Sequence, residues 1–72
     1  MDKKEKIKQD FGSHLQKLRV SKDLSIRKLA SRSNLEYSQV QRIEQGKVNI
    51  TLSTIHALAE GLEISTAELF TY

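Results

Sequence analysis

The 72-residue chain has room for one domain, and its 12 Lys and Arg against 9 Asp and Glu give it a net charge of +3. It contains no cysteine, which excludes disulfides and thiolate metal sites, and its two histidines are far apart in the sequence. No apolar run approaches the roughly 20 residues that span a bilayer. Because the Lys-rich start also lacks the apolar stretch of a signal peptide, we expect a cytoplasmic protein. The lack of proline and the presence of only three glycines favour an all-α chain.

The charge is distributed unevenly along the chain. All 12 basic residues lie in residues 1–49, whereas residues 50–72 contain three Glu and no Lys or Arg. The first two thirds of the chain are therefore suited to meet a phosphate backbone, which would repel the last third.

The first helix is predicted from about Ile7 to about Ser21. Its apolar residues recur at steps of four, four and three residues, the period of a helix with one buried face. They are Ile7, Phe11, Leu15 and Leu18. Gly12 lowers helix stability by about 1 kcal/mol relative to Ala, so we expect it to mark the close approach of another helix. Residues 1–8, MDKKEKIK, are either the solvated start of this helix or a mobile basic arm.

Residues 25–46, SIRKLASRSNLEYSQVQRIEQG, have the pattern of two short helices joined by a tight turn. The apolar residues of the two halves are Leu29, Ala30, Val40 and Ile43. Their spacing fits helices and not strands. Ser25 and Glu36 are placed to cap the two helix starts. Asn34 suits a left-handed turn residue, and Gly46 suits a C-terminal cap. This is the outline of a helix-turn-helix, whose second helix is presented to the major groove of DNA.

Two further helices are predicted after Gly46. A loop over residues 47–50 leads to a helix capped by Thr51, with apolar residues at helical spacing. These predicted core residues are Leu52, Ile55, Leu58, Ala59 and Leu62. Ser65 and Glu68 have the spacing of a capping box and precede a final short helix that holds Leu69 and Phe70. The chain is therefore expected to form five helices.

A set of residues in fixed order extends this pattern over about sixty of the 72 residues. Its motifs are Phe11-Gly12, Leu15-x-x-Leu18-Arg19, Ser25-x-x-x-Leu29-Ala30, Asn34-Leu35, Val40-x-x-Ile43-Glu44-x-Gly46, Leu58-Ala59, Leu62, Ile64-Ser65 and Glu68-Leu69-Phe70. The chain thereby resembles the phage-repressor-like (Xre or Cro-like) helix-turn-helix family. The resemblance implies a five-helix, lambda-repressor-like DNA-binding domain over residues 1–72, with the helix-turn-helix in helices two and three. In size and layout the chain is also similar to the controller proteins of restriction–modification systems.

The second helix of the motif carries the candidate base-reading residues. Helix geometry turns Val40 and Ile43 inward and leaves a polar stripe outward. The resemblance places the base-reading positions at Tyr37, Ser38, Gln41 and Arg42, with Glu36 and Gln39 beside them. Arg matches the acceptors of guanine and Gln matches the edge of adenine, whereas Tyr and Ser reach phosphates or a thymine methyl. Glu36 either caps the helix only or accepts a hydrogen bond from cytosine.

Phosphate contacts are expected from residues around this helix. The family commonly has Gln after the capping Ser, where this chain has Ile26, which cannot donate a hydrogen bond. The candidates to replace that contact are Arg27, Lys28 and Arg32, and those after the second helix are Lys47 and Asn49. In a mobile arm, Lys3, Lys4, Lys6 and Lys8 would be further, minor candidates.

Three other residues are expected to be structural. Arg19 borders the apolar stripe of the first helix, and Glu44 follows the core residue Ile43. Family members with both residues commonly bury them as a salt bridge between the first and third helices, and the resemblance implies the same here. His56 is expected to be a half-buried filler and not a metal ligand.

Residues 50–72 are expected to form a dimer interface, because this part is least suited to DNA. It holds more apolar residues than one short helical end needs to bury, namely Ile50, Leu62, Ile64, Leu69, Phe70 and Tyr72. A two-fold dimer would bind a palindromic operator.

The leading hypothesis is a dimeric, sequence-specific double-stranded DNA-binding transcriptional regulator, either repressor or activator, without cofactor or small-molecule ligand. The alternative is a protein-interaction module, such as an antitoxin-like partner, which would favour a more apolar face over Tyr37 to Arg42. RNA binding would require more aromatic platforms than Tyr37 alone. An enzyme is not expected, because no nucleophile–base set, metal cluster or phosphate-binding glycine loop is present.

Overall fold

The computed structural model describes residues 2–72 as four α-helices followed by one 3₁₀ helix. The elements are α1 (Lys3–Ser21), α2 (Ile26–Ser33), α3 (Tyr37–Glu44), α4 (Leu52–Leu62) and the 3₁₀ helix η1 (Thr66–Phe70). No strand occurs in residues 2–72, so the all-α prediction is confirmed for this range. None of these helices has the length and apolar character required to cross a membrane.

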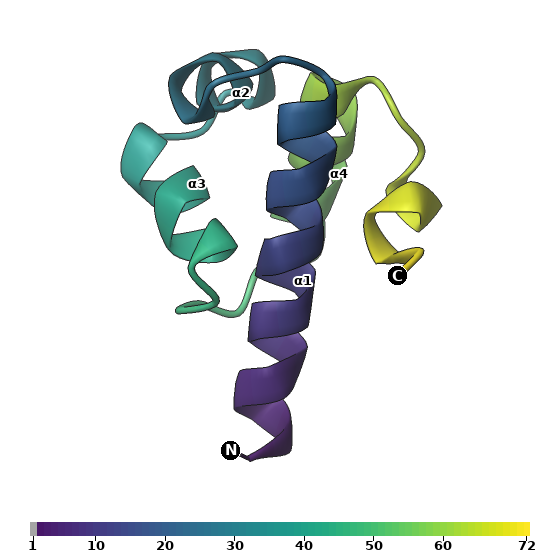
Figure 1. Ribbon diagram of the computed structural model, residues 1–72. Coiled ribbons are helices and arrows are strands. Elements are labelled where there is room, and N and C mark those ends of the chain that lie inside the picture. Colours follow the sequence, from purple (N-terminus) through teal and green to yellow (C-terminus); the bar gives the residue numbers. More distant parts are fainter. Residues whose placement is uncertain (1) are drawn as a thin grey trace.

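The first helix starts earlier than its apolar pattern predicted. The Asp2 carboxylate accepts a hydrogen bond from the Glu5 backbone N–H at 2.9 Å, which caps the helix start. Residues 3–8 are therefore helical and not a mobile arm, and Met1 lies outside the described residues. The first turns of α1 extend beyond the other helices (Figure 1). Ile7 lies on this extension and is 59% exposed, so its predicted place in the core is wrong.

The helix-turn-helix is formed by α2 and α3, and its turns have the predicted backbone geometry. Ser25 Oγ accepts the Lys28 backbone N–H at 3.0 Å and caps α2. Asn34 ends α2 in the left-handed conformation at φ 57°, and Gly46 follows α3 at φ 72°. The short side chain of Asn and the missing Cβ of Gly make this conformation accessible.

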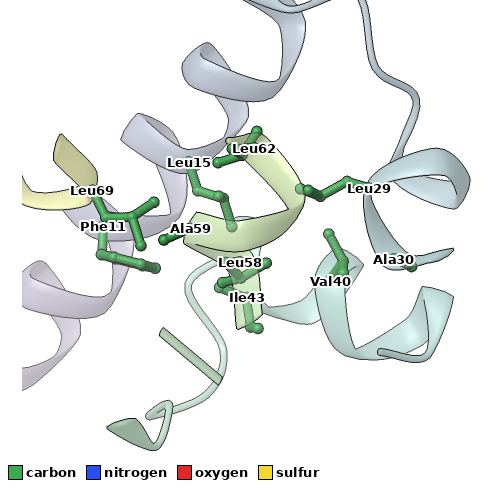
Figure 2. Packing of buried hydrophobic residues seen from close by; sticks show 10 residues of the cluster. All are labelled: Phe11, Leu15, Leu29, Ala30, Val40, Ile43, Leu58, Ala59, Leu62 and Leu69. Atoms are coloured by element: carbon green, nitrogen blue, oxygen red, sulfur yellow. The ribbon is translucent and has the colours of Figure 1, made fainter. Parts of the chain in front are cut away.

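All four α-helices and η1 contribute to one core (Figure 2). Its buried apolar residues are Phe11, Leu15, Leu29, Ala30, Val40, Ile43, Leu58, Ala59, Leu62 and Leu69. In Figure 1, α3 lies on one side of α1 and η1 lies on the other, and α2 packs against both α3 and α4. The predicted core position of Leu52 is wrong, because this first residue of α4 is 78% exposed. His56 is also exposed, contrary to its predicted role as a filler.

Gly12 marks a close approach of α1 and α3, as predicted. A Cβ atom at this position would lie 2.6 Å from the backbone carbonyl oxygen of Glu44, and it would also meet that of Ile43. Backbone atoms cannot move aside as the end of a side chain can, so only glycine fits. The absent side chain lets the end of α3 lie directly on α1.

The predicted fifth α-helix is instead the 3₁₀ helix η1, and its capping box does not form. The backbone N–H of Glu68 bonds to the carbonyl of Ser65 at 3.2 Å, an i to i+3 bond. The segment is held to α1 by His14, whose Nε2 lies 2.9 Å from the Glu68 carbonyl oxygen. Phe11 and Phe70 also pack with ring centroids 5.3 Å apart.

The position of η1 corrects part of the predicted dimer interface. Leu62 and Leu69 are almost completely buried in the core of the single chain, so neither side chain is available to a partner. Both side chains belong to the core to which α4 and η1 contribute.

Candidate nucleic-acid interface

The outward face of α3 is polar, as helix geometry predicted. Val40 and Ile43 are buried on the opposite face. The Tyr37, Ser38 and Arg42 side chains are exposed, and Gln41 is half-buried. The predicted base-reading residues therefore lie together on one helix, with donors and acceptors directed away from the core.

The start of α3 is closed by two of the flanking candidates. Glu36 occupies the N-cap position, and its backbone N–H donates to Gln39 Oε1 at 2.9 Å. Satisfying this N–H group stabilises the helix start. The amide nitrogen of Gln39 takes no part in this bond, so the residue keeps a donor for a further contact.

On one side, α3 is bordered by the start of α2. The Arg27 guanidinium lies over the Tyr37 ring, 5.6 Å from the ring centroid. Lys28, the next residue, is exposed. Arg27 therefore lies beside the exposed face of α3, and Lys28 adds a second exposed cation in the first turn of α2.

Arg32 is directed elsewhere. Its Nη2 lies 2.9 Å from Glu63 Oε2, so its charge is paired with the residue that ends α4. Glu63 has φ 60°, a left-handed conformation that the sequence pattern did not reveal. We therefore leave Arg32 out of the candidate phosphate contacts.

The other side of α3 is bordered by the loop that leads to α4. A pocket of about 290 Å³ lies between them. It is lined by Gln39, Arg42, Ile43, Val48, Asn49, Ile50, Thr51 and Thr54. The predicted candidate Asn49 thus lies beside Arg42, and Lys47 is exposed next to them.

The sequence analysis missed two hydroxyl groups on this border. Thr51 Oγ1 accepts the Thr54 backbone N–H at 3.2 Å, which fixes the first turn of α4 at the pocket. The capping role of Thr51 was predicted. Its proximity to Arg42 was not, because it depends on how the loop between α3 and α4 folds back.

Two of the four lysines in the extended first turns of α1, Lys6 and Lys8, are paired along the helix. Lys6 Nζ lies 3.1 Å from Asp10 Oδ2, and Lys8 Nζ lies 3.1 Å from Glu5 Oε1. Such pairs one turn apart lower the local excess of positive charge. This extension is therefore a weaker candidate for phosphate contact than the cations around α3.

Arg19 and Glu44 form the predicted ion pair between α1 and α3. Arg19 Nε lies 2.6 Å from Glu44 Oε2, and Arg19 Nη2 lies 3.0 Å from Glu44 Oε1. The two side chains are 11% and 6% exposed, respectively. Arg19 Nη1 also donates to the backbone carbonyl of Leu24 at 2.8 Å, a contact that the sequence did not reveal. One guanidinium therefore ties α3 and the loop before α2 to the end of α1.

The ion pair also changes the proton affinity of the arginine. The hydrogen bond to Glu44 raises the pKa of Arg19 above its usual value, although burial opposes this change. The negative charge of Glu44 acts in the same direction as its hydrogen bond. Arg19 therefore remains positively charged. Because this charge is paired with Glu44 in the interior, it is not available to bind a ligand.

The charges that remain exposed around α3 are mainly positive. They belong to Arg27, Lys28, Arg42 and Lys47, against the carboxylate of Glu36. Residues 2–72 bring together no group of three or more His, Cys, Asp or Glu suited to a metal ion. The surface is complementary in charge to a polyanion such as a nucleic acid, and its polar side chains can form hydrogen bonds at the edges of a groove.

A short, capped helix pair with an exposed polar second helix and flanking cations defines a helix-turn-helix DNA-binding domain. The family model described as Helix-turn-helix (HTH_3) matches residues 15–69. This chain belongs to that family, whose members are transcription regulators, and it is a DNA-binding regulator.

A control protein and a restriction-modification controller protein are similar to the chain over most of its length. Control protein C.MunI from Mycoplasma sp is 40% identical over 65 residues, which are 89% of this chain and 88% of that protein. The crystal structure of the restriction-modification controller protein C.AhdI from Aeromonas hydrophila has a TM-score of 0.85 and 42% identity. This match covers 86% of this chain and 94% of C.AhdI.

A larger protein contains the same fold. The HTH_3 family transcriptional regulator from Vibrio cholerae has a TM-score of 0.88 and 28% identity. The match covers 93% of this chain but 38% of that one. The similarity to the controller proteins, in contrast, extends over nearly all of both chains.

We predict that removing either member of the buried ion pair strongly destabilises the fold. Arg19→Met and Glu44→Gln should each lower the free energy of unfolding by roughly 3–5 kcal/mol, because the partner is left as an unpaired buried charge. Urea denaturation measures the change, with a stabilising osmolyte added if a variant is largely unfolded.

The double variant Arg19→Met/Glu44→Gln should lose clearly less than the sum of the two single losses. Lys6→Met, which breaks an exposed pair on α1, is the control and should cost less than about 1 kcal/mol. Strictly additive losses at Arg19 and Glu44 would contradict the role given to the pair.

Proposed function

We propose that the chain acts as a homodimer that binds a palindromic operator and regulates transcription, in the manner of a restriction–modification controller. The observation that carries this proposal is the exposed polar face of α3 between two sets of exposed cations and hydroxyls. The sequence-specific part of the function is assigned to α3, and the phosphate contacts to the borders of α3.

Each residue of the face has a role that fits its chemistry. Arg42 donates two hydrogen bonds to the O6 and N7 atoms of guanine, and Gln41 pairs with the N6 and N7 atoms of adenine. Ser38 and Tyr37 contact a phosphate or a thymine methyl. Glu36 and Gln39 hold the start of the helix and are secondary contacts.

The phosphate contacts come from both sides of the groove. Arg27 and Lys28 meet one strand at the start of α2. Lys47 and Asn49 meet the other strand from the loop before α4. These contacts set the orientation of the helix in the groove and carry no sequence information.

Similarity to the two controller proteins supports the narrower role. Both matches cover most of each chain, and both are at or above 40% identity. We infer that the operator lies near the genes of a restriction–modification system. The face of α3 supports DNA over a protein partner, because it presents Arg42 and amides and no apolar patch.

Pairing through residues 50–72 supplies the second half-site contact. Leu52 replaces Leu62 and Leu69 in the proposed interface, since it is exposed and they are buried. The apolar residues assigned to the interface are Ile50, Leu52, Ile64, Phe70 and Tyr72. A two-fold axis here would place two α3 helices about 34 Å apart, one turn of B-DNA.

Selection from a randomised duplex pool should recover a palindrome with half-sites about one turn apart. Affinity for the selected duplex should fall steeply with salt, because bound phosphates release counterions.

Arg42→Ala should cost roughly 1–3 kcal/mol of binding and relax the preference at one base pair of each half-site.

Arg32→Ala removes the same side chain and charge from a position already paired with Glu63. This control should keep the base preferences of the unaltered chain. A pool without any enriched sequence, combined with weak salt-sensitive binding, would refute the proposed function and favour a protein partner.

Analytical sedimentation should find dimers at tens of micromolar. Leu52→Glu should shift the chain toward monomer, because it places a charge in each half of the proposed apolar interface. The substitution places an acidic residue at the start of α4, where it does not destabilise the helix. Val20→Lys, at another exposed apolar residue, is the control and should leave the dimer intact. Monomers throughout this range for the unaltered chain would contradict the pairing.

A further inference from the structure

Arg27 is an unusual cation on this surface, because an aromatic ring contacts it and no carboxylate does. Its guanidinium lies 5.6 Å from the centroid of the Tyr37 ring. Within residues 2–72 its side chain forms no ion pair or hydrogen bond, in contrast to Arg19 and Arg32. The contact joins the start of α2 to the first residue of α3.

The geometry leaves the hydrogen-bonding capacity of Arg27 free. A guanidinium over a ring is attracted by the negative face of the ring, and this contact uses none of its five N–H donors. Those donors are still available for a phosphate. Arg27 can therefore hold an aromatic side chain and an anion simultaneously.

Tyr37 has a defined position even without DNA. Its side chain is 44% exposed, so part of it packs against its surroundings. Together with the Arg27 contact, this burial limits the positions open to the ring.

We propose that Arg27 is a positioning residue that fixes the Tyr37 ring and links it to a backbone phosphate at the start of α2. The pair makes the base preference at Tyr37 depend on a residue that contacts no base. This inference rests on the proposed DNA-binding function and deepens it. It also gives Arg27 a role that the neighbouring Ile26, without a donor or charge, cannot perform.

The free protein offers a direct test of the contact. The ring current of Tyr37 should shift the Arg27 side-chain proton resonances upfield in the NMR spectrum, and Tyr37→Leu should abolish the shift. Unshifted Arg27 resonances in the unaltered chain would overturn the pair, whatever the DNA affinity.

The DNA-bound state tests the consequence. Arg27→Gln and Lys28→Gln remove the same charge from adjacent exposed positions of α2. Each should lower affinity for the selected duplex and reduce the salt slope by about one. Arg27→Gln alone should also relax the preference at the base pair that Tyr37 contacts in each half-site.

A double-mutant cycle separates positioning from charge. The loss of DNA affinity caused by Arg27→Gln should be roughly two- to fivefold smaller in a Tyr37→Leu background than in the unaltered chain. Lys28→Gln should have the same effect in both backgrounds. Additive effects for Arg27 and Tyr37, or unchanged base preferences in Arg27→Gln, would overturn the positioning role. A chain that shows the NMR shift but selects no duplex would overturn the proposed function and this role with it.

Discussion

The ion pair of Arg19 and Glu44 connects the elements on which the α3 surface depends. A single guanidinium bonds to α3 through Glu44 and to the loop before α2 through the Leu24 carbonyl. A buried pair is weak evidence for net stability, because the loss of hydration offsets much of the attraction. Its directional bonds instead fix how the eight-residue helix α3 and the loop that leads into α2 are placed relative to α1. Gly12 complements the pair, because its missing side chain lets the backbone of α3 reach α1.

The packing of α3 on α1 explains why the outer face of α3 is available for binding. Val40 and Ile43 anchor the helix to the core, so its exposed polar residues contribute little to stability. The arginines and the cations around α3 fall into two groups. Arg19 is paired with a carboxylate in the interior and Arg32 with one at the surface, whereas Arg27 and the other exposed cations around α3 are not paired with a carboxylate. The division between paired and unpaired charge follows from the surroundings of each residue, since both groups contain arginine.

Local signals in the sequence predicted most of the fold. Asn34 and Gly46 mark their turns through backbone constraints that act within a few residues. The spacing of apolar residues predicted which face of a helix points inward. It did not predict how far along that helix the adjacent helices extend. Ile7 and Leu52 continue the apolar pattern past the edge of the core, so both predictions failed. The contact of Arg27 with Tyr37 could not be predicted, because it depends on how α2 and α3 are placed in space.

The central claim is that DNA binds to the face formed by α3 and its two borders. Backbone amide shifts measured by NMR during titration with the selected duplex test this claim most directly. The account predicts large changes at Arg27 and Lys28, along the exposed side of α3, and at residues 47–49. It predicts little change on the outer side of α1 around Ser13 and Val20. Changes centred on that side of α1, with α3 unaffected, would contradict the account.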